Sequence, residues 1–231
     1  MTDYRNIEVE KIVKAPISEL WQEYSAQPFC EVSPLSVDSV PTQGIIFIGI
    51  NPSLSSEDRD HLSSQPVKEI EFYSITPTQE PGHPYFKKFY EIANKSEVKL
   101  WGHLDLLYIR ETQQDKVLSL IKTSEGLDFI YRQLMVTKKV IDRLLKSEEP
   151  IIFVVADTLA RRFLGKQHDK GTNLDEWIGY DFQPNEDLGT YKLGKHHFFF
   201  TSILTGQRAL DLGSYERLIW HIKFVKDKLK K

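Results

Sequence analysis

The sequence Gly44-Ile45-Ile46-Phe47-Ile48-Gly49-Ile50-Asn51-Pro52-Ser53 joins an apolar run to an abrupt stop. The run from Gly44 to Ile50 is rich in β-branched residues, which is typical of a strand covered on both faces. Pro52 has no backbone N–H, and it disfavours helical geometry in the residue before it. The stretch therefore predicts a core strand over residues 44–50, with Asn51 at its carboxyl end.

Three further apolar runs predict strands of the same kind, at Leu104–Ile109, Pro150–Ala156 and His197–Leu204. Apolar residues at helical spacing predict helices near residues 84–93, 126–145, 159–164 and 214–230. Strands that alternate with helices favour a parallel sheet with right-handed crossovers. The expected fold class is therefore α/β, a three-layer α/β/α arrangement around a central four-stranded parallel sheet.

Composition indicates one globular domain over residues 1–231, with an N-terminal helix at 7–25 packed on it. The 231 residues are 40% hydrophobic, which is enough for one substantial core. Because 30 Lys and Arg stand against 33 Asp and Glu, any contact with nucleic acid has to be local. With a single cysteine, Cys30, and no long apolar segment, we expect a cytoplasmic protein without membrane span, metal or cofactor.

Parallel sheets of this kind bind ligands at the carboxyl ends of their strands. The polar residues that follow the four predicted strands are therefore the candidate site: Asn51 with Ser53, Arg110 with Glu111, Asp157 with Thr158, and Thr205 with Gln207 and Arg208.

Other sites are less well supported by the residues. His196 and His197 are expected to point to opposite faces of a strand, so they cannot share a metal ion. Asp105 lies inside an apolar strand and is expected to be buried with a hydrogen-bond partner. Asp157 or Thr158 is expected to cap the helix that follows, which is the simpler explanation for Asp157. No phosphate-binding glycine motif and no Gly-x-Ser-x-Gly elbow is present, which argues against a dinucleotide enzyme, an NTPase and an α/β-hydrolase.

The segment Gly49-Ile50-Asn51-Pro52-Ser53-Leu54-Ser55-Ser56 resembles the first motif of the mismatch-specific uracil and thymine DNA glycosylases, in the uracil-DNA glycosylase superfamily. His83-Pro84 and the aromatic segment after it are similar to a helix of that family. Weaker similarity in the same order continues through Leu107–Thr112, Ile152–Ala160 and Phe200–Leu218, so that the resemblance spans roughly residues 44–229.

The resemblance implies a monomeric DNA-repair enzyme that hydrolyses the N-glycosidic bond of a flipped base. In that family the residue at Asn51 positions a water molecule, and the backbone N–H of Ile50 points at the base. Phe72 or Tyr73 is expected to stack on the base, although packing against the sheet explains both rings equally well. The remaining residues expected at the base pocket are Gly49, Pro52, Ser53 and Asp157.

The segment Ser202–Arg208 departs from the second motif of the family, which carries His or Asn followed by Pro-Ser. Contacts to DNA are still expected from this segment, at Thr205, Gly206, Gln207 and Arg208, the last to a phosphate. The departure also leaves an alternative open: a catalytically inactive or diverged relative that acts as a nucleic-acid-binding or interaction module.

Overall fold

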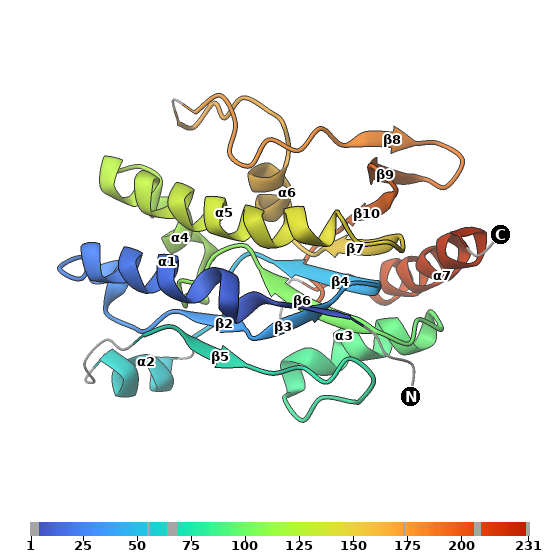
Figure 1. Cartoon of the computed structure of the whole chain (residues 1–231), viewed down its shortest axis with the longest axis horizontal. Helices are drawn as coiled ribbons and strands as arrows, with labels where there is room; N and C mark the ends of the chain where they lie inside the picture. The colour runs from blue at the N-terminus through green and yellow to red at the C-terminus, as the bar shows by residue number, and fades with distance from the viewer. Residues whose placement is uncertain (1–4, 55, 64–68, 173, 206–208, 230–231) are drawn as a thin grey trace.

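The computed structural model describes residues 5–54, 56–63, 69–172, 174–205 and 209–229 (Figure 1). Strands and helices alternate along most of the chain. In chain order the elements are β1 Asn6–Glu8, α1 Val9–Glu23, a 3-10 turn at Pro28–Cys30, β2 Leu35–Val37, β3 Ser39–Pro41, β4 Gly44–Gly49, α2 Ser56–Ser63, β5 Glu71–Tyr73, α3 Pro84–Lys95, β6 Trp101–Asp105, α4 Gln114–Leu120, α5 Ser124–Leu144, β7 Ile151–Val155, α6 Thr158–Leu164, β8 Gln183–Asn185, β9 Thr190–Leu193, β10 His196–Phe200 and α7 Leu212–Leu229.

The main sheet has six strands in the order β6-β4-β7-β10-β9-β8. β4 pairs in parallel with both β6 and β7, and β7 pairs in parallel with β10. β9 then runs antiparallel to β10 and to β8. The protein is therefore an α/β protein with a mixed sheet, and the expectation of four strands, all parallel, does not describe the whole sheet.

The two additional strands lie in a part of the chain for which the sequence predicts no strand. β8 and β9 are three and four residues long, and their residues include Pro184 and Lys192. Between them Gly189 has a φ of 62°, a backbone conformation that glycine adopts without steric cost. Proline and lysine are common on edge strands, so a short polar hairpin at the sheet edge carries little apolar pattern.

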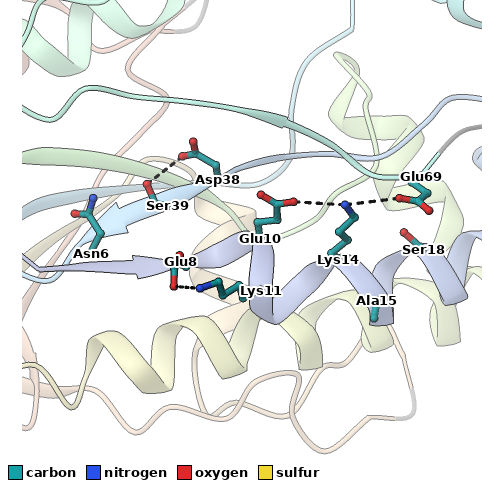
Figure 2. Close-up of a pocket in the computed structure, with 10 residues that line it drawn as sticks. All are labelled: Asn6, Glu8, Glu10, Lys11, Lys14, Ala15, Ser18, Asp38, Ser39 and Glu69. Carbon is teal, nitrogen blue, oxygen red and sulfur yellow. Dashed lines mark hydrogen bonds and ion pairs between the residues drawn. The ribbon is translucent and has the colours of Figure 1, made fainter.

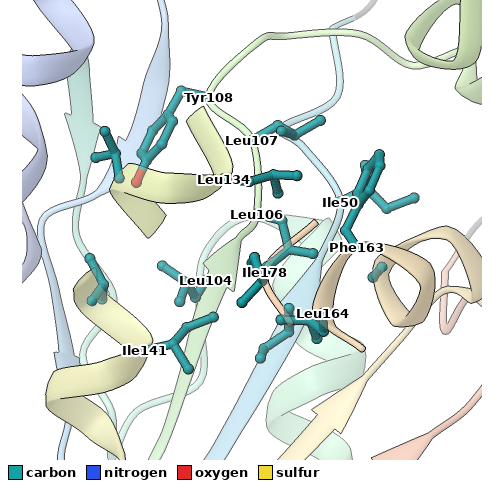
Figure 3. Packing of buried hydrophobic residues seen from close by; sticks show 14 of the residues in the cluster. Ile50, Leu104, Leu106, Leu107, Tyr108, Leu134, Ile141, Phe163, Leu164 and Ile178 are labelled. Atoms are coloured by element: carbon teal, nitrogen blue, oxygen red, sulfur yellow. The ribbon is translucent and has the colours of Figure 1, made fainter. Parts of the chain in front are cut away.

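Residues of β4 alternate between two hydrophobic clusters on opposite faces of the sheet. Ile46 and Ile48 pack in a cluster with residues of α1, α5 and α6, part of which is shown in Figure 3. Ile45 and Phe47 pack in a second cluster with residues of α3 and α7. All four side chains are fully buried, as the continuous apolar run predicts. Helices therefore cover both faces of the sheet.

The second parallel strand is earlier in the chain than predicted. It ends at Asp105, and the apolar residues Leu106–Ile109 continue as buried, non-strand backbone. The side chain of Gln133 on α5, itself fully buried, holds this segment: its Oε1 accepts hydrogen bonds from the backbone N–H groups of Tyr108 and Ile109, at 2.8 and 3.2 Å. An apolar run therefore predicted burial correctly but the strand bounds wrongly.

The N-terminal region contains the predicted helix with shorter bounds, because α1 begins at Val9 and β1 precedes it and pairs with β3. α1 packs against α5 through Trp21, whose ring lies 4.8 Å from that of Phe129. The chain between Leu54 and α3, for which the sequence predicts neither helix nor strand, contains α2 and also β5, which pairs with β2. Of the helices described, none has the length and apolar character needed to cross a membrane.

Replacing Gln133 by leucine should lower the free energy of unfolding by about 2–4 kcal/mol, because two buried N–H groups lose their acceptor. Urea denaturation measures the change. The matched control is Gln22→Leu on the exposed face of α1, for which a change within about 0.5 kcal/mol is expected. Equal stability of the two variants would show that the Gln133 amide does not hold the chain after β6.

Candidate functional site

A cavity of about 680 Å³ opens beside the carboxyl ends of β4 and β6. Pro52 and Ser53 come to it directly after β4, and Asp105 comes from the last position of β6. The remaining walls come from β5, from the segment before α3 and from the start of α3. Its lining includes Tyr73, His83, Tyr85, Phe86, His103 and Arg110. Residues at or just after the carboxyl ends of β4 and β6 therefore line the same cavity.

His103 and Asp105 form the polar floor of this cavity. They are two residues apart on β6, so their side chains point to the same face of the sheet. His103 is 1% exposed and Asp105 is 8% exposed. The hydroxyl of Tyr73 lies 3.1 Å from His103 Nδ1, whereas His103 Nε2 and Asp105 Oδ1 are buried and have no hydrogen-bond partner among the described residues. Such unpaired buried groups are costly and rare, and a catalytic role is one of the reasons for which proteins keep them.

Burial makes both side chains of the floor neutral near pH 7. It raises the pKa of Asp105 to about 8 and lowers the pKa of His103 to about 3, because in each case the charged form loses its hydration. The 3.8 Å separation of His103 Nδ1 from Asp105 Oδ2 is therefore a contact between two uncharged groups and not an ion pair. A protonated carboxyl offers one donor and one acceptor side by side.

Gly49, the last residue of β4, makes room for this floor. Its Cα pairs with Asp105 across the sheet, and a Cβ at this position would collide with Asp105 Oδ1 and lie 3.3 Å from His103 Nε2. The glycine of the Gly-Ile-Asn-Pro-Ser segment thus allows a carboxyl group and an imidazole to pack against the backbone of the neighbouring strand.

Aromatic rings form one wall of the cavity. Tyr73 and Phe86 lie 5.4 Å apart with an angle of 31° between their planes, and Tyr85 meets His103 edge-on at 5.8 Å. Burial and then the nearby Asp105 raise the pKa of the Tyr85 hydroxyl, and a hydrogen bond with Thr205 opposes this effect. Thr205, a predicted contact to DNA, is thereby placed beside the same wall.

Asn51 is half-buried and does not line the cavity. Its Nδ2 donates to the carbonyl oxygens of Glu111 and Pro52, at 2.6 and 3.0 Å. These bonds tie the exit of β4 to the chain that follows β6, while the hydrogen bonds described for this side chain leave Oδ1 unused. The predicted catalytic asparagine is thus next to the hollow, one residue before its lining begins.

The other predicted residues are distributed over several places. Tyr73 lines the cavity, but Phe72 packs against the large core cluster and Ile50 is buried in it. Asp157 caps α6 as predicted, accepting a 2.7 Å hydrogen bond from Leu159 N, and it faces a different hollow. Gly206, Gln207 and Arg208 lie outside the described residues.

The floor residues were not predicted as site residues, although the sequence contains a signal for them. The sequence predicts that Asp105 is a buried carboxylate with a hydrogen-bond partner. For Asp105 Oδ1 that expectation is wrong, since it has no partner among the described residues. Two titratable residues spaced i, i+2 in an apolar run place both groups on one face of a strand, which is the pattern that points to them.

Another hollow, of about 860 Å³, lies over β1, the start of α1 and β3 (Figure 2). Both of its lysines are ion-paired: Lys11 with Glu8 at 2.6 Å, and Lys14 with both Glu10 and Glu69 at 3.5 and 3.8 Å. Its other carboxylate, Asp38, accepts hydrogen bonds from the hydroxyl groups of Ser39 and Ser74, so that each charged group of this hollow has a partner within the protein. In the described ranges, no three His, Cys, Asp or Glu residues are grouped so that they could hold a metal ion.

Comparison with known proteins gives no match: no protein-family model, no curated protein and no solved structure is significantly similar to this chain.

The free energy of unfolding should fall as the pH rises from about 6.5 to 8, and the fall should disappear in Asp105→Asn. The folded carboxyl, with its pKa raised to about 8, keeps a proton that the unfolded carboxyl loses near pH 4, so the folded state binds more protons in this range. The neutral His103 has the opposite effect, but only below its ordinary pKa of about 6.5.

We expect wild type to lose about 1–2 kcal/mol relative to Asp105→Asn between these two pH values, since one proton per pH unit corresponds to about 1.4 kcal/mol. Urea midpoints of both proteins at each pH measure the difference. A difference that stays constant over the range would mean that Asp105 is already ionised in the folded protein.

Proposed function

We propose that this protein is a DNA glycosylase of the uracil-DNA glycosylase type, which hydrolyses the N-glycosidic bond of a base flipped out of DNA. One observation carries the proposal: a cavity large enough for a base begins directly after the Gly49–Pro52 strand exit and combines an aromatic wall with a neutral polar floor. An extruded base is typically held by stacking and by hydrogen bonds to its edge. The contiguous parallel strands β6, β4, β7 and β10 agree with the sheet that the resemblance implies.

The chemistry follows from how charge develops during cleavage. The departing base becomes negative and the sugar positive, while water supplies a hydroxyl group to the sugar carbon and a proton to the base. The protonated carboxyl of Asp105 can donate to the base as its charge grows. Oδ1 of Asn51 can accept a hydrogen bond from the attacking water, but as a neutral amide it does not remove a proton.

The floor also favours a class of base. A protonated carboxyl complements an edge on which a carbonyl lies beside an N–H group, as in uracil, thymine, hypoxanthine and xanthine. Above the pKa of Asp105 the carboxylate can only accept hydrogen bonds and repels the carbonyl. Binding of such bases is therefore expected to weaken as the pH rises past about 8.

A second function is favoured by the position of Asn51. Its amide is bonded to Glu111 and Pro52, it does not line the cavity, and the second motif of the family is altered. A diverged relative that binds a nucleic acid or another partner without cleaving it would have these features. Binding of a uracil-containing oligonucleotide without release of base would favour this alternative.

Purified protein should release at least one base from a panel of uracil, thymine-mismatch, hypoxanthine and xanthine DNA. Asp105→Ala should slow release about 10²-fold, the cost of removing one donor aimed at a developing negative charge. Asp105→Asn should recover part of this rate and lose the decline above about pH 8, because an amide does not titrate. Asn51→Ala should slow release by about tenfold or more.

The matched control is Asp181→Asn, an exposed carboxylate before β8, which should leave the rate unchanged. DNA that contains only cytosine and adenine as candidate bases tests whether the protein selects bases with a carbonyl beside an N–H group. The proposal is overturned if no base of the panel is released, or if Asp105→Ala and Asn51→Ala both behave like the control.

A further inference from the structure

A second cavity, of about 530 Å³, lies between the start of α6, the start of α7 and the carboxyl end of β10. Two arginines line it, Arg161 from α6 and Arg217 from α7. Hydroxyl groups come from the ends of α6 and β10, at Thr158, Thr201 and Ser202. The Ser214 hydroxyl is already engaged, because it donates to Asp211 Oδ2 at 2.6 Å and accepts a 3.0 Å hydrogen bond from Arg217 Nη2. The cavity therefore presents donors from three separate elements at the same edge of the sheet as the first cavity.

Arg161 is held in place by aromatic rings. Its guanidinium carbon lies 5.2 Å from the centre of the Tyr191 ring and 4.9 Å from that of Phe200, and its Nη2 is 3.3 Å from the Tyr191 hydroxyl. Tyr191 belongs to β9, in the antiparallel part of the sheet. A planar cation stacked on two rings is fixed in orientation without losing its charge.

The two arginines of this cavity differ from other cationic side chains of the protein that are paired with a carboxylate. Arg162 pairs with Asp169, and Lys226 pairs with Glu97. Among the described residues neither Arg161 nor Arg217 forms an ion pair, although Arg217, after the hydrogen bond from Ser214, helps to lower the pKa of Asp211.

The acid and the histidine of the cavity are already engaged. Asp157 accepts hydrogen bonds from Leu159 N and Gln114, and burial raises the pKa of its carboxyl. His221 Nε2 lies 2.6 Å from the carbonyl oxygen of Leu188. The two arginines are therefore the side chains of this cavity that retain full positive charge for a ligand.

One short segment connects the two cavities. Thr201 and Ser202 line the second cavity, and Thr205 is hydrogen-bonded to Tyr85, which lines the first. Three residues span at most about 11 Å from Ser202 to Thr205. A chain-like ligand can therefore reach both cavities at once by following this segment.

We infer that the second cavity binds a backbone phosphate of the DNA strand whose flipped nucleotide occupies the first cavity, an inference that rests on the proposed function. The forked N–H groups of arginine match phosphate oxygens, and hydroxyl groups are common partners in the same contacts. Such a local site is what a protein of net charge -3 needs in order to hold a polyanion. A free phosphate or nucleotide has the same chemistry, so the test separates it from a strand.

Affinity for a labelled single-stranded oligonucleotide with an abasic-site analogue, which cannot be cleaved, tests the inference over a series of salt concentrations. Arg161→Gln and Arg217→Gln should each bind about tenfold more weakly at low salt. Each should also reduce the slope of log affinity against log salt by about 0.7, the value for one lost phosphate contact on a single strand. Arg161→Lys should keep most of the slope because it keeps the charge.

Arg143→Gln is the matched control: Arg143 is an exposed arginine near the end of α5, and β7 begins just after this helix, at the opposite edge of the sheet. Circular dichroism checks that each variant is folded. Affinity and slope equal to the control, in an enzyme that releases base, overturn the inference and leave the proposed function intact. Lower affinity and slope without base release support the phosphate site while the proposed function fails. Competition by inorganic phosphate or a nucleoside monophosphate, with no arginine effect on the oligonucleotide, assigns the cavity to a free anion and overturns the inference.

Discussion

Burial of β4 on both faces is the constraint on which the rest of the structure depends. Ile46 and Ile48 face one hydrophobic cluster, and Ile45 and Phe47 face the other, so helices have to cover both sides of the sheet. A strand covered in this way pairs with neighbours on both edges, here β6 and β7. Its end at Asn51-Pro52 then fixes the place where polar chain leaves the core. Both cavities lie at this edge because the parallel strands all end there.

The floor of the first cavity, His103 and Asp105, destabilises the folded protein. A carboxyl group and an imidazole are buried side by side, and each keeps an atom without a hydrogen bond among the described residues. They remain neutral because the surrounding rings exclude water, and the lack of a side chain at Gly49 gives them room. Hydrophobic side chains of similar size would be more stable here. Buried groups with strongly shifted pKa values are found most often at functional sites, and this makes the floor the best candidate for one.

Under the proposed function, the two cavities would divide between them the base and the phosphate of a flipped nucleotide. The first has an aromatic wall and a floor of two uncharged groups, which suit a neutral base, and its arginine, Arg110, lies 3.6 Å from the carboxylate of Glu71. The second has two arginines without an ion pair among the described residues and several hydroxyl groups, which suit a phosphate. The antiparallel hairpin contributes through Tyr191, which orients Arg161. An extension of the sheet thus serves the second cavity.

The sequence by itself determined the α/β class, the burial of β4 and its end at Asn51-Pro52, because a continuous apolar run and a proline act locally. It also limited the cap of α6 to Asp157 or Thr158, of which the structure has Asp157. Only the tertiary structure decided that Asp105 lines a cavity and that the Asn51 amide donates a hydrogen bond to the backbone carbonyl of Glu111. The same holds for Arg161, which meets Tyr191 of a strand thirty positions later. These contacts join residues far apart in the chain, and the pairing of strands and the packing of helices, which no local pattern specifies, bring them together.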